Sequence, residues 1–397
     1  MRPILTALLL SVAAPALAAT GEGEIIVPCG GPFSSFVQNM EQAAVQRGAD
    51  PATARAFFAN VRQDSATLAA DQRQGVFTLP FTDFARRLIS NARMQNGQAN
   101  ADRYAQTFQQ VQSQFGVPEG ILLAFWAFET DYGAVQGDFN TVNSLVTLGH
   151  DCRRPGLFQP QVLAALELYA RGDLDPATTT GAWAGEIGQV QMLPEDILTN
   201  GVDGDGDGQV TLKTSAPDAL MSGAKMLQDL GWRANEPWLQ EITLPQGFPL
   251  DQSGLEVTKS GSEWAAMGVS PRSGGIAGPN LPASVILPQG QGGPAFLAYP
   301  NFSVLFEWNQ SFTYVLTAAY FATRLEGAPV FNAGNPTPPL SDAEMRSLQT
   351  KLQSMGYDVG SVDGILGAGT RGAVRAEQAR LGLPVDGWPT RQLLNAL

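Results

Sequence analysis

Hydrophobic residues recur with a helical period through the N-terminal half of the chain. Asp50 precedes a proline and predicts a helix start, because aspartate caps a helix well and proline suits its first position. Asn100 predicts the cap of another helix, whose apolar stripe runs from Tyr104 to Phe115. Over residues 239–299 short apolar runs alternate with glycine and proline clusters, which is typical of a small sheet or an elaborated loop region. We therefore expect a mainly α protein of the α+β class.

A change in composition divides the chain into two expected domains. Residues 328–340, APVFNAGNPTPPL, concentrate proline, glycine and asparagine after the helical pattern of residues 310–326. Such a composition predicts an extended linker. We therefore expect one domain over residues 19–327 and a second over residues 341–397.

The N-terminus has the features of an export signal. Arg2 supplies positive charge, the stretch Ile4–Ala14 is apolar, and Ala16-Leu17-Ala18 matches a cleavage site. A membrane anchor is the alternative, but the apolar run is shorter than the roughly 18 residues that span a bilayer. We expect a signal peptide over residues 1–18, a mature chain that begins at Ala19, a periplasmic location and no stable membrane anchor.

Composition narrows the classes of function. Hydrophobic residues make up 44% of the chain and charged residues 15%, which excludes a disordered protein. The net charge of -13 argues against nucleic acid as a partner, because phosphates would be repelled. With one histidine, His150, and two cysteines, most zinc sites cannot be built, and a Ser/His/Asp triad would need that one imidazole. Catalysis is expected to depend on carboxylates.

The two cysteines, Cys29 and Cys152, are expected to form a disulfide. Export into an oxidising compartment favours this bond, which would close a long loop. Two buried free thiols are the alternative, because a sequence does not give the distance between the two Cα atoms.

The segment GVPEGILLAFWAFETDYG, residues 116–133, carries the strongest candidate for catalysis. It predicts a helix in which Leu122 and Trp126 lie seven and three residues before Glu129 and share its face. A partly desolvated glutamate has a raised pKa and can hold the proton that a general acid needs. The alternative is a glutamate at the edge of the stripe that reaches solvent or pairs with an arginine such as Arg153.

Three motifs resemble one known family. They are residues 116–133, WAGEIGQVQMLPEDIL at 183–198 and NFSVLFEWNQSFTYVLTAAYFATRL at 301–325. In this order they look like the lytic murein transglycosylase B family, and the resemblance covers roughly residues 30–326. It implies a lysozyme-like, α-rich catalytic domain that cleaves the bond between N-acetylmuramic acid and N-acetylglucosamine in peptidoglycan glycan strands.

The resemblance also implies roles for particular residues. Glu129 matches the catalytic glutamate, Gln189 and Gln191 fall on the motif that lines the sugar cleft, and Asn309 and Tyr314 match cleft residues. The implied mechanism uses Glu129 first as acid and then as base, with the 6-hydroxyl of the muramic acid as nucleophile, and gives a 1,6-anhydro product. No cofactor is needed for this reaction.

Three positions depart from the family pattern. Ala182 stands where the family often has serine, Glu186 where it has a small residue, and Trp308 where it usually has tyrosine. Glu186 could support a hydrolytic mechanism with two carboxylates, but we expect it at a solvated rim. Trp308 could either stack on a sugar ring or pack in the core.

The run DGDGDGQVTL, residues 203–212, has the spacing of an EF-hand calcium loop. Its expected ligands are the carboxylates of Asp203, Asp205 and Asp207 and the main-chain carbonyl of Gln209. Thr214 stands where a bidentate glutamate is usual, and the resemblance implies a later aspartate, for which Asp218 is the candidate. The motif predicts a structural Ca²⁺ site, and an acidic, glycine-rich surface turn is the alternative.

The C-terminal segment resembles the type 1 peptidoglycan-binding domain. MGY, VDGILGAGT, AVRAEQ and LPVDG follow in order within residues 341–397, and Leu348, Leu352 and Met355 form one helical stripe. The resemblance implies a small three-helix domain, and a helical dimerisation or linker module is the alternative.

Three classes of function follow from these observations. The first is a periplasmic lytic transglycosylase held on its polymer by a binding domain. The second is a muramidase that admits water, and the third is a cell-wall-binding scaffold without turnover. The intact Glu129 argues against the scaffold.

Overall fold

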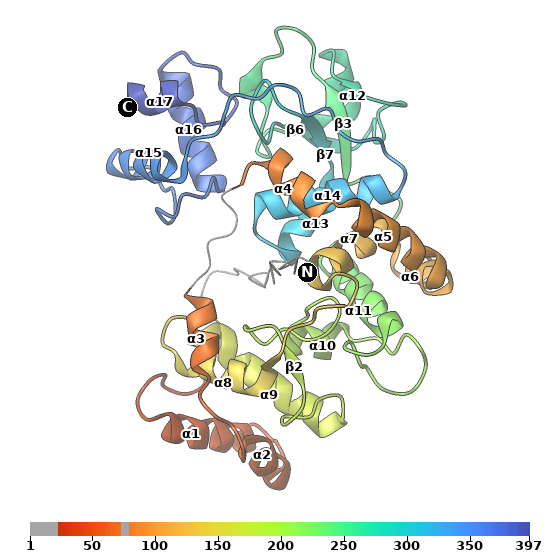
Figure 1. The fold of residues 1–397 in the computed structure, drawn as a ribbon, viewed down its shortest axis with the longest axis vertical. Coiled ribbons are helices and arrows are strands. Elements are labelled where there is room, and N and C mark those ends of the chain that lie inside the picture. The colour runs from red at the N-terminus through yellow and green to blue at the C-terminus, as the bar shows by residue number, and fades with distance from the viewer. Residues whose placement is uncertain (1–22, 73–78) are drawn as a thin grey trace, which may run out of the picture. The chain divides into compact units, whose positions relative to one another are not determined.

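The computed structural model describes residues 23–72 and 79–397 of the protein (Figure 1). The expected signal peptide, residues 1–18, lies outside this part of the chain. Helices dominate, with small sheets, which confirms the predicted mainly α class. No helix in the described part of the chain has the length and apolar character that a membrane span requires. The described residues form two compact units: the first comprises residues 23–72, Ala99–Ser113 and Phe125–Met226, and the second comprises residues 79–98, Gln114–Ala124 and Leu227–Leu397.

The first unit is built around two helices, α8 and α9, which pack closely on each other (Figure 1). Asp50 caps α2 as predicted, since its carboxylate accepts the Thr53 amide at 2.8 Å. The elements that lie within this unit are α1 (Phe33–Gln46), α2 (Pro51–Phe58), α3 (Ser65–Asp71), β1 (Phe139–Asn140), α8 (Thr141–His150), α9 (Pro155–Arg171), β2 (Thr180–Gly181) and α10 (Pro194–Asn200). Strands β1 and β2 pair with each other in antiparallel fashion.

Four helices have residues in both units: α5 (Asn91–Arg103), α6 (Ala105–Phe115), α7 (Glu119–Thr130) and α11 (Ala216–Asp229). The prediction that Asn100 caps a helix is wrong, because Asn100 lies inside α5. Ser90 begins this helix by accepting the Arg93 amide on its hydroxyl at 3.1 Å. The Tyr104 amide then donates to the carbonyl of Asn100 at 2.9 Å, so the helical pattern passes through Asn100 without a break there.

Cys29 and Cys152 form a disulfide within the first unit, which confirms the predicted bond and excludes the free thiols. Their Cα atoms lie 5.4 Å apart and are separated by 123 positions in the sequence. The bond joins the segment before α1 to the segment between α8 and α9. It therefore closes a large part of the first unit into one covalent loop.

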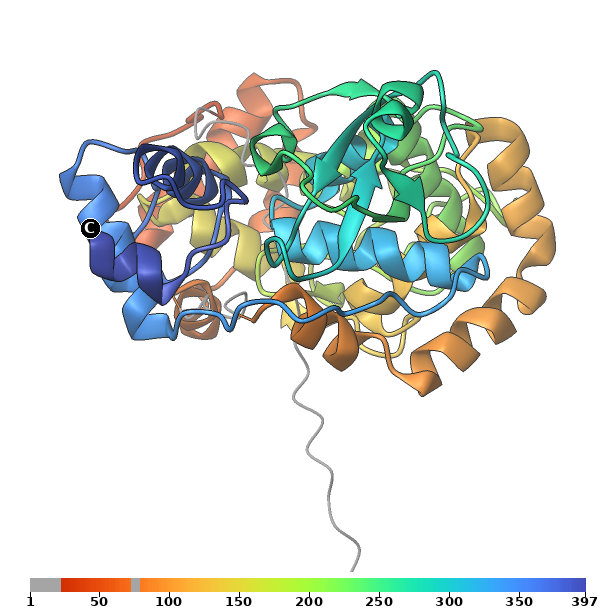
Figure 2. The ribbon, with the colours of Figure 1, turned by 90° about the horizontal axis from the view of Figure 1, so that it is seen from above.

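The second unit contains a five-stranded antiparallel sheet in the order β4-β6-β7-β3-β5, which confirms a sheet in the region of short apolar runs. The strands are β3 (Leu239–Thr243), β4 (Lys259–Ser260), β5 (Ser270–Pro271), β6 (Pro282–Ile286) and β7 (Ala295–Ala298). Trp264 anchors the core on this sheet: its ring is fully buried and its indole donates to the carbonyl of Ala283 at 2.8 Å. Figure 2 shows the long helix α14 running beside the strands. The helices and the 3₁₀ turn around the sheet are α4 (Phe81–Leu88), η1 (Leu250–Gln252), α12 (Gly261–Ala266), α13 (Pro300–Trp308) and α14 (Phe312–Leu325).

The C-terminal helices form a small core of their own. They are α15 (Asp342–Ser354), α16 (Ala368–Arg380) and α17 (Arg391–Ala396). Leu348 and Leu352 of the predicted stripe are fully buried, but Met355 is 44% exposed because α15 has already ended. The side-chain oxygen of Gln349 accepts the backbone amide of Gly364, in the loop between α15 and α16, at 2.8 Å.

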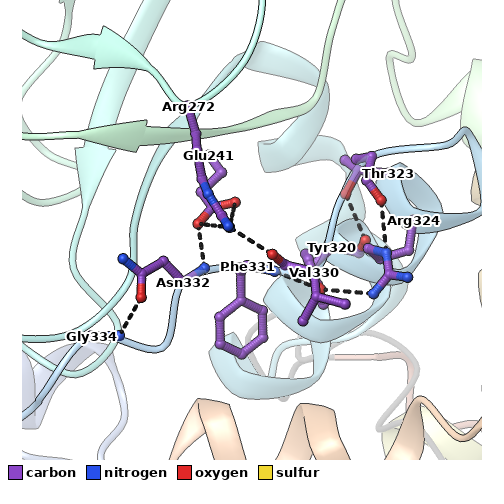
Figure 3. A network of polar contacts seen from close by, with 10 residues as sticks. Glu241, Arg272, Tyr320, Thr323, Arg324, Val330, Phe331, Asn332 and Gly334 are labelled. Atoms are coloured by element: carbon purple, nitrogen blue, oxygen red, sulfur yellow. Dashed lines mark hydrogen bonds and ion pairs between the residues drawn. The ribbon is translucent and has the colours of Figure 1, made fainter.

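The predicted linker, residues 328–340, has no helix or strand and is anchored to the second unit along its path (Figure 3). The Phe331 amide donates to the Tyr320 hydroxyl at 3.1 Å, and the two rings lie 4.8 Å apart. The Asn332 amide donates to Glu241 at 2.7 Å. Arg272 then bridges Glu241 and a linker carbonyl. The linker is thus fastened to the sheet and to α14.

Candidate active site

Glu129 lies near the C-terminal end of α7, a helix that is buried over its whole second part. Every residue from Ile121 to Thr130 is buried, and Glu129 itself is only 6% exposed. Arg153, the expected alternative partner, forms ion pairs with Asp71 and Asp151 instead. The sequence therefore identified the carboxyl correctly as one that is withdrawn from water.

The chain reverses immediately after Glu129. Asp131 and Tyr132 both adopt left-handed backbone conformations, with φ of 50° and 61°. Such conformations cost about 1–2 kcal/mol each for residues other than glycine, and they concentrate at functional sites. The Thr130 hydroxyl accepts the Gly133 amide at 2.9 Å and stabilises the turn. Because the chain reverses here, α7 ends at Thr130, directly after Glu129.

The loop that carries Gln189 is fastened to this turn. The Thr130 hydroxyl donates to the carbonyl of Gln189 at 2.6 Å. Gly133 has a φ of 83°, which favours glycine, and a Cβ atom there would lie 2.6 Å from the side-chain oxygen of Gln189. Gln191 has a φ of 54°, and its side-chain Nε2 donates to the carbonyl of Gly188 at 2.7 Å. The structure thus places both predicted cleft glutamines in the loop that is bound to the end of α7.

Thr130 and Gly133 were missed by the sequence analysis. The hydroxyl of Thr130 connects the acid's helix to the glutamine loop, and Gly133 makes room for the glutamine side chain. A threonine directly after the candidate acid, followed by glycine three positions later, is the signal that could have identified them.

The expectation that Glu186 lies at a solvated rim is wrong. Glu186 is 2% exposed, because the tight loop around it turns inward: its carbonyl accepts the Ala182 amide at 3.0 Å. Burial raises the pKa of Glu186 to about 7, although nearby backbone amides and the positive charge of Arg154 act in the opposite direction. Near neutral pH this carboxyl therefore carries a proton in a large part of the molecules.

We expect the Glu186→Gln variant to gain stability over the wild type as the pH rises. Below pH 4.5 Glu186 is protonated in both the folded and the unfolded wild type, so its pKa shift has no effect there. Between pH 4.5 and about 7 the unfolded chain releases the proton while the folded chain keeps it, so the wild type loses stability. At about 1.4 kcal/mol per pKa unit the total loss is ~3 kcal/mol. Urea unfolding of both proteins at several pH values measures it, and a pH-independent difference would contradict the shift.

The predicted cleft residues of the third motif lie together at the junction of α13 and α14 in the second unit. Trp308 is 5% exposed and Asn309 and Tyr314 are fully buried. The Asn309 side-chain oxygen accepts the Ser311 amide at 2.8 Å, and Ser311 caps α14. The burial of Trp308 favours core packing, one of the two roles expected for it.

The expected calcium loop brings three carboxylates together. Ligand oxygens of Asp203, Asp205 and Asp218 lie within 4.8 Å of one another. Asp218 is fully buried and accepts the Gly204 amide at 2.9 Å, which draws the loop onto the first turn of α11. Asp207 is outside this group, and its carboxylate accepts the amide of Gln209 at 2.8 Å.

A buried acid near the end of a central helix, held against a glutamine loop in an α-rich fold, defines the class of lysozyme-like proteins that cleave glycans. Comparisons with known proteins agree. The sequence profile described as "Transglycosylase SLT domain" matches residues 32–323, and the profile of the peptidoglycan binding domain matches residues 341–397. The chain belongs to the transglycosylase SLT domain family.

Relatives extend this comparison. The chain is 27% identical to membrane-bound lytic murein transglycosylase B of Escherichia coli over 236 residues, which is 59% of this chain and 64% of that protein. The crystal structure of SltB3 from Pseudomonas aeruginosa in complex with NAG-anhNAM-pentapeptide has a TM-score of 0.83 and 36% identity, and the match covers 92% of this chain and 99% of that one. The E. coli lytic transglycosylase Slt35 in complex with calcium, at 23% identity and a TM-score of 0.64, shares the fold over 77% of this chain and 98% of its own.

Proposed function

We propose that the protein is a periplasmic lytic transglycosylase that cleaves the bond between N-acetylmuramic acid and N-acetylglucosamine in peptidoglycan and forms a 1,6-anhydro muramic product. The observation that carries the proposal is the buried Glu129 beside the loop of Gln189. The likeness to SltB3, whose structure holds an anhydro-muropeptide, supports the same reaction. The C-terminal segment, residues 341–397, supplies a second contact with the polymer.

Glu129 acts twice in the proposed mechanism. It first donates its proton to the glycosidic oxygen, while the N-acetyl group of the substrate stabilises the positive charge at the anomeric carbon. The carboxylate that remains then takes the proton of the muramic 6-hydroxyl, whose oxygen attacks the anomeric carbon. Glu129 returns to its starting state, and no water is consumed. A buried carboxyl suits both steps, because exclusion of water strengthens its interactions with the reacting atoms.

The protein chain supports Glu129 through its own hydrogen bonds. The hydroxyl of Thr130 links α7 to the carbonyl of Gln189. The side-chain amide of Gln136 donates to the carbonyls of Gly133 and Lys213 at 3.1 and 3.0 Å. These hydrogen bonds fix the turn after Glu129 relative to the loop that carries Gln189. We infer that Gln189 and Gln191 contact the sugar from this loop. The roles of Asn309 and Tyr314 in sugar binding stay predictions, and the burial of Trp308 favours core packing.

Digestion of purified peptidoglycan by the mature protein tests the proposal. We expect soluble muropeptides that end in a 1,6-anhydro group. Reducing-end products would instead show a muramidase, and a folded, wall-binding protein without products would show a scaffold.

We also propose that Asp203, Asp205 and Asp218 hold a structural Ca²⁺ ion. Clustered carboxylates are the hard oxygen ligands that Ca²⁺ prefers, and the carbonyl of Gln209 and the carboxylate of Asp207 are further candidates from the sequence motif. Positive φ at Gly206 and Gly208 gives the loop its sharp turns. An ion there would stabilise the loop against α11 and would take no part in the chemistry.

We expect the Asp205→Asn variant to lose most of the rise in melting temperature that Ca²⁺ gives the wild type. One carboxylate of the group of three is removed, and the loss of its charge weakens the site. Asp138→Asn is the matched control, since this exposed aspartate lies outside the loop and the group of three, and it should keep most of the rise. Thermal unfolding with calcium and with a chelator measures both. No calcium-dependent rise in the wild type would overturn the site.

A further inference from the structure

A groove in the second unit lies between the C-terminal helices and the sheet-bearing part of the chain. Its volume is about 440 Å³. One wall comes from residues 253–256 and the end of β6, another from the turn between α13 and α14, and the third from the start of α16. Leu255, Leu287 and Phe306 give it an apolar lining, and Leu255 is 39% exposed there. The proposed mechanism does not use this groove.

The walls of the groove are joined by specific polar contacts. Arg375 of α16 forms an ion pair with Glu256 at 3.0 Å and donates to the Ser253 hydroxyl at 3.2 Å. The Gln291 amide donates to the carboxylate of Asp386 at 2.9 Å. Together with the anchored linker, these contacts make the groove a built feature of the second unit.

Arg371 brings a positive charge into the apolar lining. Its guanidinium lies 4.8 Å from the ring centre of Phe312, and its Nη2 donates to the carbonyl of Pro288 at 3.0 Å. Its Nε is buried and has no hydrogen-bond partner among the described residues. Burial lowers the pKa of Arg371 to about 10, so the charge persists at neutral pH. The carboxylate of Asp386, which also lines the groove, attracts this charge, but it already accepts hydrogen bonds from Gln291, Gln378 and Trp388.

The first turn of α16 adds a second source of positive potential. Gly367 and Ala368 line the groove, and no side chain caps this 13-residue helix. The free amides at a helix start favour an anion, and Arg371 projects from the same turn. The carboxylates of Glu256 and Asp386 are engaged in the contacts that join the walls. The groove therefore combines apolar surface with a site for one negative group.

We propose that this groove binds the peptide stem of peptidoglycan, with the C-terminal carboxylate of the peptide on Arg371 and the start of α16 and its apolar side chains on the lining. Capture of a carboxylate by backbone amides and an arginine is a known mode of peptide recognition. The proposal rests on the proposed function for its choice of polymer. Phe306 and Gln310 line the groove on either side of Asn309 in the sequence, so a strand that reaches α13 could present its peptide here.

Calorimetric titration of the full-length protein tests the proposal without any turnover. The probe is a stem pentapeptide without sugar, compared with the same peptide carrying a C-terminal amide. We expect the free acid to bind at least about tenfold more tightly than the amide. This comparison uses only the wild type, so it does not depend on the folding of a variant. It also separates the groove from the proposed reaction, because an inactive protein can still bind the peptide.

Arg371→Met should reduce binding of the free acid by about tenfold and bring it to the level of the amide. Arg380→Met is the matched control on the same helix, since Arg380 is exposed and pairs with Glu377, and its affinity should stay unchanged. Equal binding of acid and amide by the wild type, or full binding by a folded Arg371→Met variant, overturns the proposal. A NAG-NAM disaccharide without peptide that displaces the pentapeptide would also overturn it, because the groove would then be a sugar site.

Discussion

The Glu129→Gln variant will release soluble fragments from peptidoglycan at least about a hundredfold more slowly than the wild type, because general acid catalysis contributes roughly that factor or more. Glutamine keeps the size of the side chain but can neither donate the proton to the glycosidic oxygen nor accept one from the 6-hydroxyl. Since Glu129 is 6% exposed, the neutral amide should also be tolerated by the fold. Fragment release from purified peptidoglycan measures the rate.

Two controls make this result specific. Glu167→Gln removes a negative charge from the exposed face of α9, where Glu167 pairs with Arg171, and should leave the rate unchanged. The melting temperature of Glu129→Gln should remain at or above that of the wild type, because a buried carboxyl is replaced by a neutral group. A folded Glu129→Gln variant that releases fragments at the normal rate would remove Glu129 from the mechanism.

The second large effect is expected from the disulfide. Replacement of both Cys29 and Cys152 by serine should lower the free energy of unfolding by about 4–5 kcal/mol, because the bond closes a loop of 123 positions and restricts the unfolded chain. Urea unfolding without reductant compares the two proteins. The wild type in reductant should unfold at the same midpoint as the variant.

A wild type that unfolds at the same urea concentration with and without reductant would contradict this expectation. Activity provides an independent check. The two bonded segments, one before α1 and one between α8 and α9, contain neither Glu129 nor the glutamine loop, so the folded double variant should still cleave peptidoglycan at low temperature. Loss of cleavage by a folded variant would show that the bond also shapes the cleft.

Local signals in the sequence predicted much of the fold. Asp50 caps its helix as expected, because an N-cap aspartate acts on amides only a few positions away. The short apolar runs that became β6 and β7 indicated a small sheet or an elaborated loop region, and the order of the strands in the sheet depends on distant residues. The predicted cap at Asn100 was wrong, because Ser90 caps this helix and begins it earlier in the sequence.

The residues of the candidate site, too, were predicted only in part from the sequence. Glu129 was recognisable because a carboxylate among apolar residues at helical spacing is rare, and the aspartates of the calcium loop follow a fixed spacing. Glu186 was placed wrongly, since its burial depends on the fold of the whole loop, which the neighbouring residues in the sequence do not reveal. No pattern in the sequence indicated a binding role for Arg371, because the segments that line its groove are far apart along the chain.

Digestion of purified peptidoglycan in water labelled with heavy oxygen, followed by mass spectrometry of the muropeptides, tests the central claim most directly. The proposed mechanism predicts fragments that are one water lighter than hydrolysis products and that carry no label at the muramic end, because the 6-hydroxyl of the same sugar is the nucleophile. Fragments with a labelled reducing end would show that water attacks the anomeric carbon, and would contradict the assignment of the protein as a lytic transglycosylase.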